Sequence, residues 1–219
     1  MATLLLVAHP LLDVLLEAAR GRAPAPDGRV DVLPALAGPV DAIVTFTARA
    51  FIVADVDPDL VRSRLRPNDP GAPTLPAFVT WLADQVGGRA GQVDVVLAAP
   101  ALEGPAPLPL DDRDDMTHHH RVARAGRYRT HLRVVTNEGD GAVLVIGRGL
   151  AGRWEAAFEV APERRGRGAG RALALAARHL VPPEQHVFVQ VSPGNAASLR
   201  AVLAAGYRPI GSEVLIPRG

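Results

Sequence analysis

The order of apolar segments after residue 130 constrains the fold of this chain most strongly. Stretches with the two-residue period of a strand alternate there with stretches that have the spacing of a helix. The expected elements are strands at 130–137, 142–146 and 153–160, a helix at 173–180, a strand at 187–191, a helix at 196–205 and a strand at 207–216. Because strands and helices alternate, the order predicts an α/β fold with a mixed twisted sheet flanked by helices. The segment EGDG at 138–141 predicts a hairpin turn between the first two strands.

The first half of the chain predicts further elements but no chemical motif. We expect a helix at 11–20, an extended apolar segment at 40–56, a short helix from Asp57-Pro58, a helix at 77–86 and a strand at 93–98. The Pro-rich stretch 100–109 predicts a surface linker or a long loop. We therefore divide the chain into an N-terminal α/β segment of unknown role at 1–90 and a second domain at 91–219.

A short repeat bears on the relation between these two parts. The segment PALAGP at 34–39 recurs as PALEGP at 100–105, each a few residues after Val-Asp-Val. The repeat raises the hypothesis that residues 1–90 are a degenerate half of the second domain. In a chain so rich in alanine and proline, coincidence is the simpler interpretation.

Composition excludes several classes of site and partner. The chain has no cysteine, so it has no disulfide, no thiolate metal ligand and no cysteine nucleophile. All 24 basic residues are arginine, and a net charge of +1 gives no overall field for nucleic acid or an anionic membrane. The apolar run at 4–7 lacks the basic flank of a signal peptide. We expect a cytoplasmic monomer or homodimer with no nucleic-acid or membrane partner.

The stretch VAPERRGRGAGR at 160–171 is the most informative about function. It places a proline-marked turn and three glycines between an expected strand and an expected helix. Glycines let the backbone approach a ligand closely, and the amides at the start of a helix attract anions. The arginines add positive charge suited to phosphates. The pattern predicts a cradle for a pyrophosphate, and the alternative is a β–α turn with a solvated arginine cluster.

A second motif follows the next expected strand. It is NAASLR at 195–200, and the helix that it begins ends in Gly206-Tyr207. The run RGRGAG at 165–170 resembles the acyl-CoA signature of the GNAT superfamily of N-acyltransferases, and NAASLR resembles the second motif of that superfamily. Two motifs at this separation are more specific than either alone. The resemblance covers roughly residues 91–219 and implies a GNAT-type acetyltransferase domain there.

The resemblance implies transfer of an acetyl or other acyl group from acetyl-CoA to a primary amine, with no metal. Strands 153–160 and 187–191 would splay and admit the pantetheine arm of the cofactor. Main-chain groups near Phe158 and Val160 would pair with its amides, and the amides of 165–170 would hold the pyrophosphate. The residues implied in cofactor binding are Phe158, Val160, Arg165, Gly166, Arg167, Gly168, Ala169, Gly170, Arg171, Asn195, Ser198 and Arg200.

The chain departs from the pattern of the superfamily at one position. Many GNAT enzymes carry a tyrosine seven residues after the motif asparagine, where it protonates the departing thiolate, but this position is Val202. Either another acid serves or the thiolate leaves unassisted, which a thiol pKa of about 8.5 makes tolerable. The departure also supports the alternative of a catalytically inactive acyl-CoA-binding sensor or partner module.

Two glutamates are candidates for the base that deprotonates the amine. Alternation along 154–160 places Glu155 and Glu159 on the face opposite Trp154 and Phe158. If the glutamate face looks into the cleft, either carboxylate can take the proton, directly or through water. The alternative is that both are solvated or pair with arginines.

Other polar patterns have simpler interpretations. The G-x-G-x-x-G run at 147–152 precedes a strand instead of the helix of a dinucleotide site, so we expect a turn. Adjacent side chains diverge, so the three histidines at 118–120 predict a helix start or one histidine at the substrate mouth, and no metal site. The acidic residues of 111–115 suit a cationic amine, although plain surface acidity is the simpler account. Tyr128 and Tyr207 are expected to be half-buried core residues, with the alternative that either hydroxyl reaches the cleft.

Overall fold

The computed structural model describes residues 9–137, 139 and 141–218. The apolar run at 4–7 lies outside these residues, as does part of the expected turn at 138–141. The helices are α1 (Pro10–Ala19), α2 (Pro58–Arg64), α3 (Pro76–Gln85), α4 (His120–Gly126), α5 (Ala169–Ala177) and α6 (Ala196–Ala204). In the described part of the chain, no helix combines the length and apolarity needed to cross a bilayer.

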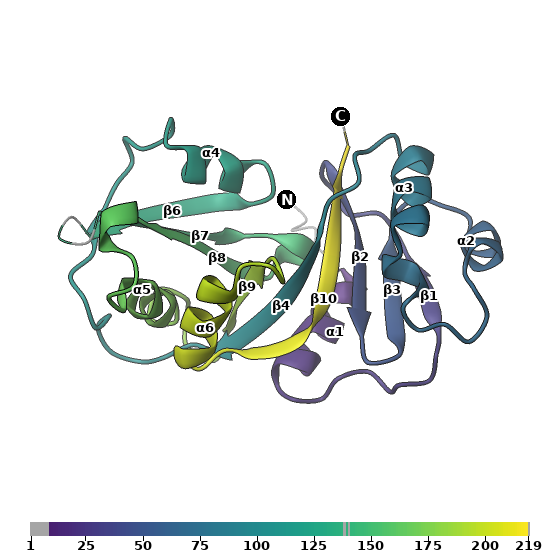
Figure 1. The fold of residues 1–219 in the computed structure, drawn as a ribbon, viewed down its shortest axis with the longest axis horizontal. Coiled ribbons are helices and arrows are strands. Elements are labelled where there is room, and N and C mark those ends of the chain that lie inside the picture. The colour runs from purple at the N-terminus through teal and green to yellow at the C-terminus, as the bar shows by residue number, and fades with distance from the viewer. Residues whose placement is uncertain (1–8, 138, 140, 219) are drawn as a thin grey trace, which may run out of the picture.

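The strands form one mixed sheet with helices on both faces, so the predicted α/β architecture is confirmed (Figure 1). The strands are β1 (Val30–Leu33), β2 (Val40–Phe46), β3 (Arg49–Val53), β4 (Val93–Pro100), β5 (Asp111–Asp112), β6 (Thr130–Asn137), β7 (Ala142–Arg148), β8 (Trp154–Val160), β9 (His186–Val191) and β10 (Arg208–Pro217). Their order in the sheet is β1-β3-β2-β10-β4-β9-β8-β7-β6-β5. The β1–β3 and β8–β9 pairs are parallel, and the other pairs are antiparallel.

The last strand joins the two parts of the sheet. β10 lies between β2 and β4 and pairs antiparallel with both. In Figure 1 it runs through the middle of the molecule, with β1–β3 on one side and β4 to β9 on the other. The expected division near residue 90 falls in the loop before β4, and whether residues 1–90 are a separate domain stays a prediction.

Three parts of the chain differ from the sequence expectation. The segment 40–56 is a hairpin of β2 and β3, whose turn places Ala48 at φ 51°. Because no glycine or proline marks this turn, the sequence pattern looks continuous. β1 is an additional strand at the edge of the sheet, and the acidic run contributes β5 at the opposite edge. The repeated segments PALAGP at 34–39 and PALEGP at 100–105 follow the edge strand β1 and the central strand β4, so they occupy different environments.

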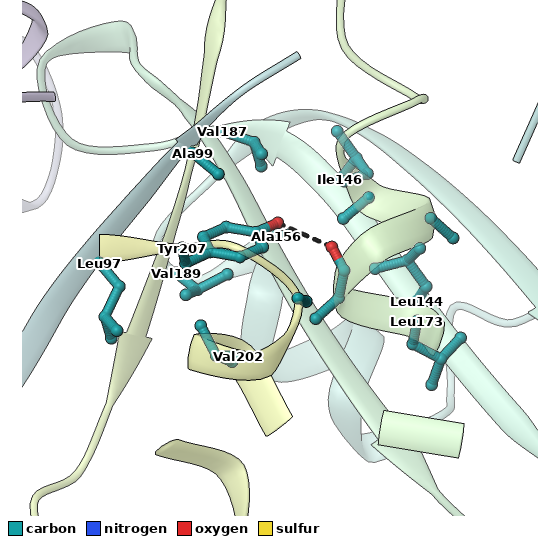
Figure 2. Close-up of a cluster of buried hydrophobic side chains, with 14 of the residues drawn as sticks. Leu97, Ala99, Leu144, Ile146, Ala156, Leu173, Val187, Val189, Val202 and Tyr207 are labelled. Atoms are coloured by element: carbon teal, nitrogen blue, oxygen red, sulfur yellow. Dashed lines mark hydrogen bonds between the residues drawn. The ribbon is translucent and has the colours of Figure 1, made fainter. Parts of the chain in front are cut away.

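The two faces of the sheet are packed by separate apolar clusters. One cluster lies under α5 and α6 and includes Leu97, Leu144, Leu173, Val189, Val202 and Tyr207 (Figure 2). On the opposite face, α1 packs Leu11 and Leu15 against Val96 and Phe188. α4 covers the same face further along, with Val122 against Val145. The sheet therefore separates α5 and α6 from α4, which decides how a ligand reaches its middle.

Candidate functional site

Strands β8 and β9 run parallel but separate after two residue pairs. The pairs are Trp154 with Val187 and Glu155 with Phe188. Beyond them, β8 continues along β7 and β9 continues along β4. The facing edges of β8 and β9 therefore have no further sheet pairing with each other in the described chain. Unpaired backbone groups need other partners, so a ligand with its own amide groups fits this opening.

The separation opens a cleft with a volume of about 700 Å³. Phe158, Val189 and Val191 line it and belong to the apolar cluster on the α5–α6 side of the sheet. Arg121 and Arg124 line it from α4, on the other side. The cleft is therefore a passage through the sheet, and its volume is in the range of small-molecule sites.

The glycine-rich loop leads into α5 with an open backbone. Gly168 is the N-cap of α5 at φ 91°, and Gly166 has φ 75°. A Cβ atom at either position would meet no atom within 4 Å. No side chain of the described residues caps the first turn of the helix. The first amides of α5 therefore have no side-chain acceptor in the described chain, and their binding of a pyrophosphate stays a prediction.

Gly170 has a different role from the other two loop glycines. A Cβ atom there would lie 3.6 Å from the Cβ of Ala201 and 3.9 Å from Cε2 of Phe158. Gly170 therefore lies where α5 packs on α6 and β8. Both distances are ordinary van der Waals contacts, so alanine also fits this position.

Arg165 holds the loop to the end of the strand before it. Its Nε donates to the Val160 carbonyl oxygen at 3.0 Å, which occupies one acceptor site of that carbonyl. Arg167 and Arg171 are exposed. Contacts from these arginines, or from the loop amides, to a phosphate stay predictions.

The start of α6 brings the second motif to the cleft. Asn195 is the N-cap of α6, and its Oδ1 accepts a hydrogen bond from the Ser198 amide at 3.1 Å. Both residues line the cleft, as does Phe158. Of the other residues expected to bind the cofactor, Val160, Arg200 and the loop 165–171 lie outside its lining. Their part in binding stays a prediction.

Glu155 lies in a buried ion-pair network beside the last β8–β9 pair. Its carboxylate accepts from Arg153 Nε at 2.9 Å and from the Leu150 amide at 3.1 Å, and it lies 2.8 Å from Arg129 Nε. Arg153 also donates to Glu213 at 2.7 and 2.9 Å. Burial would raise the pKa of Glu155, but the two arginines outweigh it and the pKa is lowered. The geometry favours a structural role, although the catalytic role is untested.

The G-x-G-x-x-G run at 147–152 packs against this ion-pair network. It forms the turn between β7 and β8, with the short η3 helix at Leu150–Gly152, as expected. A Cβ atom on Gly149 would lie 2.1 Å from the Glu155 carboxyl carbon. The glycine is therefore needed for the close approach of a carboxylate, and this run is not followed by the helix that a dinucleotide site requires.

Glu159 lies on the α4 side of β8, within reach of an arginine and a histidine. Its Oε2 is 3.2 Å from Arg121 Nε and 2.7 Å from His120 Nε2. Burial alone would raise the pKa of Glu159, but Arg121 and His120 outweigh this effect and the pKa is lowered. Arg121 and His120 also line the cleft. Neither Glu155 nor Glu159 lines the cleft, but Glu159 is partly exposed whereas Glu155 is buried. The role of Glu159 as a base stays a prediction.

The histidine run begins α4, as expected. His119 is the N-cap, and its Nδ1 accepts from the Arg121 amide at 3.2 Å. The expectation that adjacent rings diverge is wrong for one pair, because the His119 and His120 rings stack with centroids 4.7 Å apart. The cap residue is extended and the next residue is helical, which turns the two rings together. Among the described residues, no group of histidine or acidic side chains is arranged to hold a metal ion.

The acidic run lies away from the cleft. Asp111 and Asp112 form β5 at the edge of the sheet, and Asp112 pairs with Arg133. None of the described aspartates of this run lines the cleft. This placement supports the simpler account, surface acidity.

Two of the positions considered for proton donation lie in the core. Val202 is fully buried on α6, next to Tyr207 in the apolar cluster (Figure 2). The Tyr207 hydroxyl donates to the Ala174 carbonyl at 3.0 Å, and burial raises its pKa. Tyr207 is more buried than expected, and it does not line the cleft. Tyr128 lines the cleft, so it is the better placed of the two tyrosines to donate a proton to a ligand there.

Sequence reasoning missed several residues that line the cleft. They are Arg89, Asp94, Arg124 and Gln190. These residues come from the loop before β4, from β4, from α4 and from β9, so no local pattern links them. The sheet order alone brings them together, and the sequence holds no signal for it.

The sequence matches no protein-family model and no curated protein. The structure is similar to a GCN5-related N-acetyltransferase from Kribbella flavida, with 16% identity, 97% of this chain and 95% of that chain covered, and a TM-score of 0.46.

Two further solved structures are similar over less of the chain. A GCN5-related N-acetyltransferase from Sphaerobacter thermophilus has 17% identity, 69% of this chain and 57% of that chain covered, and a TM-score of 0.38. This chain thus spans just over half the length of that protein. A protein described as an acetyltransferase from the GNAT family, from Novosphingobium aromaticivorans, has 19% identity, 61% of this chain and 68% of that chain covered, and a TM-score of 0.38.

Proposed function

We propose that this chain is an acyl-CoA-dependent N-acyltransferase that moves an acetyl group from acetyl-CoA to a primary amine. The observation that carries the proposal is the separation of β8 from β9 after two pairs, beside the glycine-capped start of α5. The pantetheine arm of CoA has amides that can pair with the open strand edges. The pyrophosphate of CoA suits the free amides of the helix start.

The passage through the sheet suits direct transfer between two bound substrates. Acetyl-CoA enters from the α5–α6 side, and the amine reaches the thioester from the α4 side. The amine nitrogen attacks the thioester carbonyl carbon, a C–N bond forms, and the C–S bond breaks with its electron pair going to sulfur. The amine gives up its proton to a base, and the CoA thiolate takes up a proton from a donor or from water. Holding both reactants in one passage supplies the proximity that such a step needs.

The side chains near the passage suggest how the protons move. Glu159 is the better placed of the two candidate bases, because Glu155 is enclosed by arginines. Tyr128 lines the cleft and can donate a proton to the leaving thiolate. With a thiol pKa of about 8.5, the thiolate can also leave without a donor.

Binding of acetyl-CoA is tested by a thermal scan. A ligand that binds only the native state adds roughly 2.7 kcal/mol at a hundredfold excess over Kd. We expect millimolar acetyl-CoA to raise the melting temperature. No shift with acetyl-CoA, free CoA or longer acyl-CoAs would overturn the cofactor assignment.

A second candidate function is an acyl-CoA-binding module without catalysis. The observations that favour it are the apolar side chain of Val202, which has no proton to give, and the burial of Tyr207, whose hydroxyl already donates to the Ala174 carbonyl. Thiol release from acetyl-CoA with a panel of amines separates the two functions. Thermal stabilisation without release from any amine would favour the binding module.

A further inference from the structure

Five arginines line the cleft. Arg121, Arg124, Arg127 and Arg129 line it from α4 and the residues just after it, and Arg89 lines it from the loop before β4. Among the described lining residues, Asp94 is the single carboxylate. An excess of arginine at one end of a cleft attracts anions and raises their local concentration there.

Some of these arginines already have partners inside the protein. Arg121 pairs with Glu159, and Arg129 pairs with Glu155 and donates to the Gln190 side chain. The other three have no ion pair within the described parts of the chain, and all three are exposed. We call them the mouth arginines: Arg89, Arg124 and Arg127.

Asp94 lies beside the mouth arginines on β4. It is partly buried, accepts a hydrogen bond from the Gln92 side chain at 3.0 Å and interacts electrostatically with Arg124. Burial raises its pKa, Gln92 and Arg124 lower it, and the net pKa is raised. A partly buried carboxylate at the edge of a cationic cleft is suited to an ammonium group.

We propose that the acceptor is an amine that also carries a carboxylate or phosphate, with the anionic group on the mouth arginines and the amino group directed at Asp94. The inference rests on the proposed function and names the class of its acceptor. The phosphates of CoA do not account for these arginines, because α4 and α5 cover opposite faces of the sheet. Guanidinium groups bind carboxylate and phosphate alike, so the charge alone does not distinguish them.

Matched acceptors test the inference. Thiol release from acetyl-CoA is measured with 4-aminobutyrate against butylamine, and with 2-aminoethyl phosphate against ethanolamine. We expect kcat/KM at least tenfold higher for the anionic member of one or both pairs, and the pair with the larger gain identifies the anion. The chain has no lysine, so acetylation of lysine side chains adds nothing to the signal.

Variants assign the effect to the residues. Arg124→Gln should lower kcat/KM at least tenfold for the preferred anionic amine and less than twofold for its neutral partner. Asp94→Asn should lower kcat/KM for both, because both carry the amino group. Arg208→Gln, an exposed arginine of β10 outside the cleft lining, is the matched control and should change neither.

The outcomes separate this inference from the proposed function. Release with every amine but no preference for the anionic members, or an equal loss for both in Arg124→Gln, overturns the inference and leaves acyl transfer standing. Release from no amine overturns acyl transfer. In that case, binding of the amines is measured without catalysis, as the change in the melting temperature of the CoA-bound protein when each amine is added. A larger increase with the anionic amine than with its neutral partner in either pair supports the inference, and equal increases in both pairs overturn it.

Discussion

The two proposed binding regions, a cofactor end and an acceptor end, are built in different ways. The proposed cofactor end is a contiguous loop and helix start, in which Gly166 and Gly168 leave amides open within a few residues. The proposed acceptor end gathers Arg89, Asp94 and Arg124, which line the cleft, from separate elements that only the sheet order brings together. A substitution at one backbone position can abolish ligand binding by a contiguous loop. Binding by a site assembled from several elements depends instead on the interactions that hold those elements in place. Substitutions at the two ends should therefore fail in different ways.

The largest effect is expected at the cofactor end, from Gly168→Val. At φ 91° a β-branched residue is strained, and its side chain would occupy the space next to the α5 amides. We expect the Kd for acetyl-CoA to rise about 100-fold, which corresponds to the loss of one or two charged hydrogen bonds of roughly 1.5–3 kcal/mol each. Isothermal titration calorimetry measures the Kd.

The matched control for this variant is Gly21→Val. Gly21 has φ 85° and open space around its Cβ position, and it does not line the cleft. It carries similar backbone strain without a ligand nearby. If Gly168→Val binds acetyl-CoA as the unchanged protein does, the loop is only a turn and the contrast between the two ends fails.

The second largest effect is expected in the network beneath the acceptor end, from Glu155→Gln. Removing one charge of a buried ion pair typically costs about 3 kcal/mol or more, because the partner arginines stay buried. We expect urea denaturation to show a loss of that order. Glu17→Gln, in an exposed ion pair, is the control and should shift the midpoint far less.

The same network predicts a dependence on pH. The pKa of Glu155 is lower in the folded state than in the unfolded chain, so its stabilisation is complete above the unfolded pKa, about 4.3. The stabilisation is lost as the pH falls through the lower folded pKa. The difference in unfolding free energy between the unchanged protein and Glu155→Gln should therefore shrink below about pH 4. A constant difference from pH 7 to pH 3 would contradict the network's role.

A smaller effect, on rate, is expected from Glu159→Gln. An amine acceptor is mostly protonated at pH 7, and a positioned carboxylate typically contributes about 10² to 10⁴ in rate. We expect kcat to fall at least tenfold with CoA affinity preserved, and to recover partly at higher pH as free amine accumulates. The pH profile separates a lost base from a lost contact with Arg121.

The same measurement on Glu155→Gln completes the test of the base. Near-native kcat in both variants from pH 6 to pH 9 would show that neither glutamate takes the proton. Asp94 and His120, which line the cleft, would then be the next candidates.

The smallest effect is expected from Gly170→Ala. The added methyl group meets Ala201 and Phe158 at ordinary contact distances, and alanine favours helix by roughly 1 kcal/mol over glycine. We expect unchanged or slightly higher stability and a Kd for acetyl-CoA within threefold. A large loss of affinity would show that Gly170, like Gly168, is needed for close approach of the ligand.

The contrast between the two ends also explains what the sequence could predict. The helices, most strands and the open loop at 166–168 follow from local periodicity, capping residues and glycine, so they were predictable. The hairpin of β2 and β3 was not, because its turn at Ala48 has neither glycine nor proline. The enclosure of Glu155 was not predictable either, since the sheet order brings Arg129 to it and brings Glu213 to its other partner, Arg153.

The place of β10 in the sheet affects when the protein can fold during synthesis. β2 and β4 both pair with β10, so the ribosome makes them well before their shared neighbour exists. The hydrogen bond between Thr45 and Ser212 joins residues 167 positions apart. Until 208–217 have left the ribosome, both older strands keep an open edge that can pair with other chains. We therefore expect slow folding, with its last step set by the arrival of this strand.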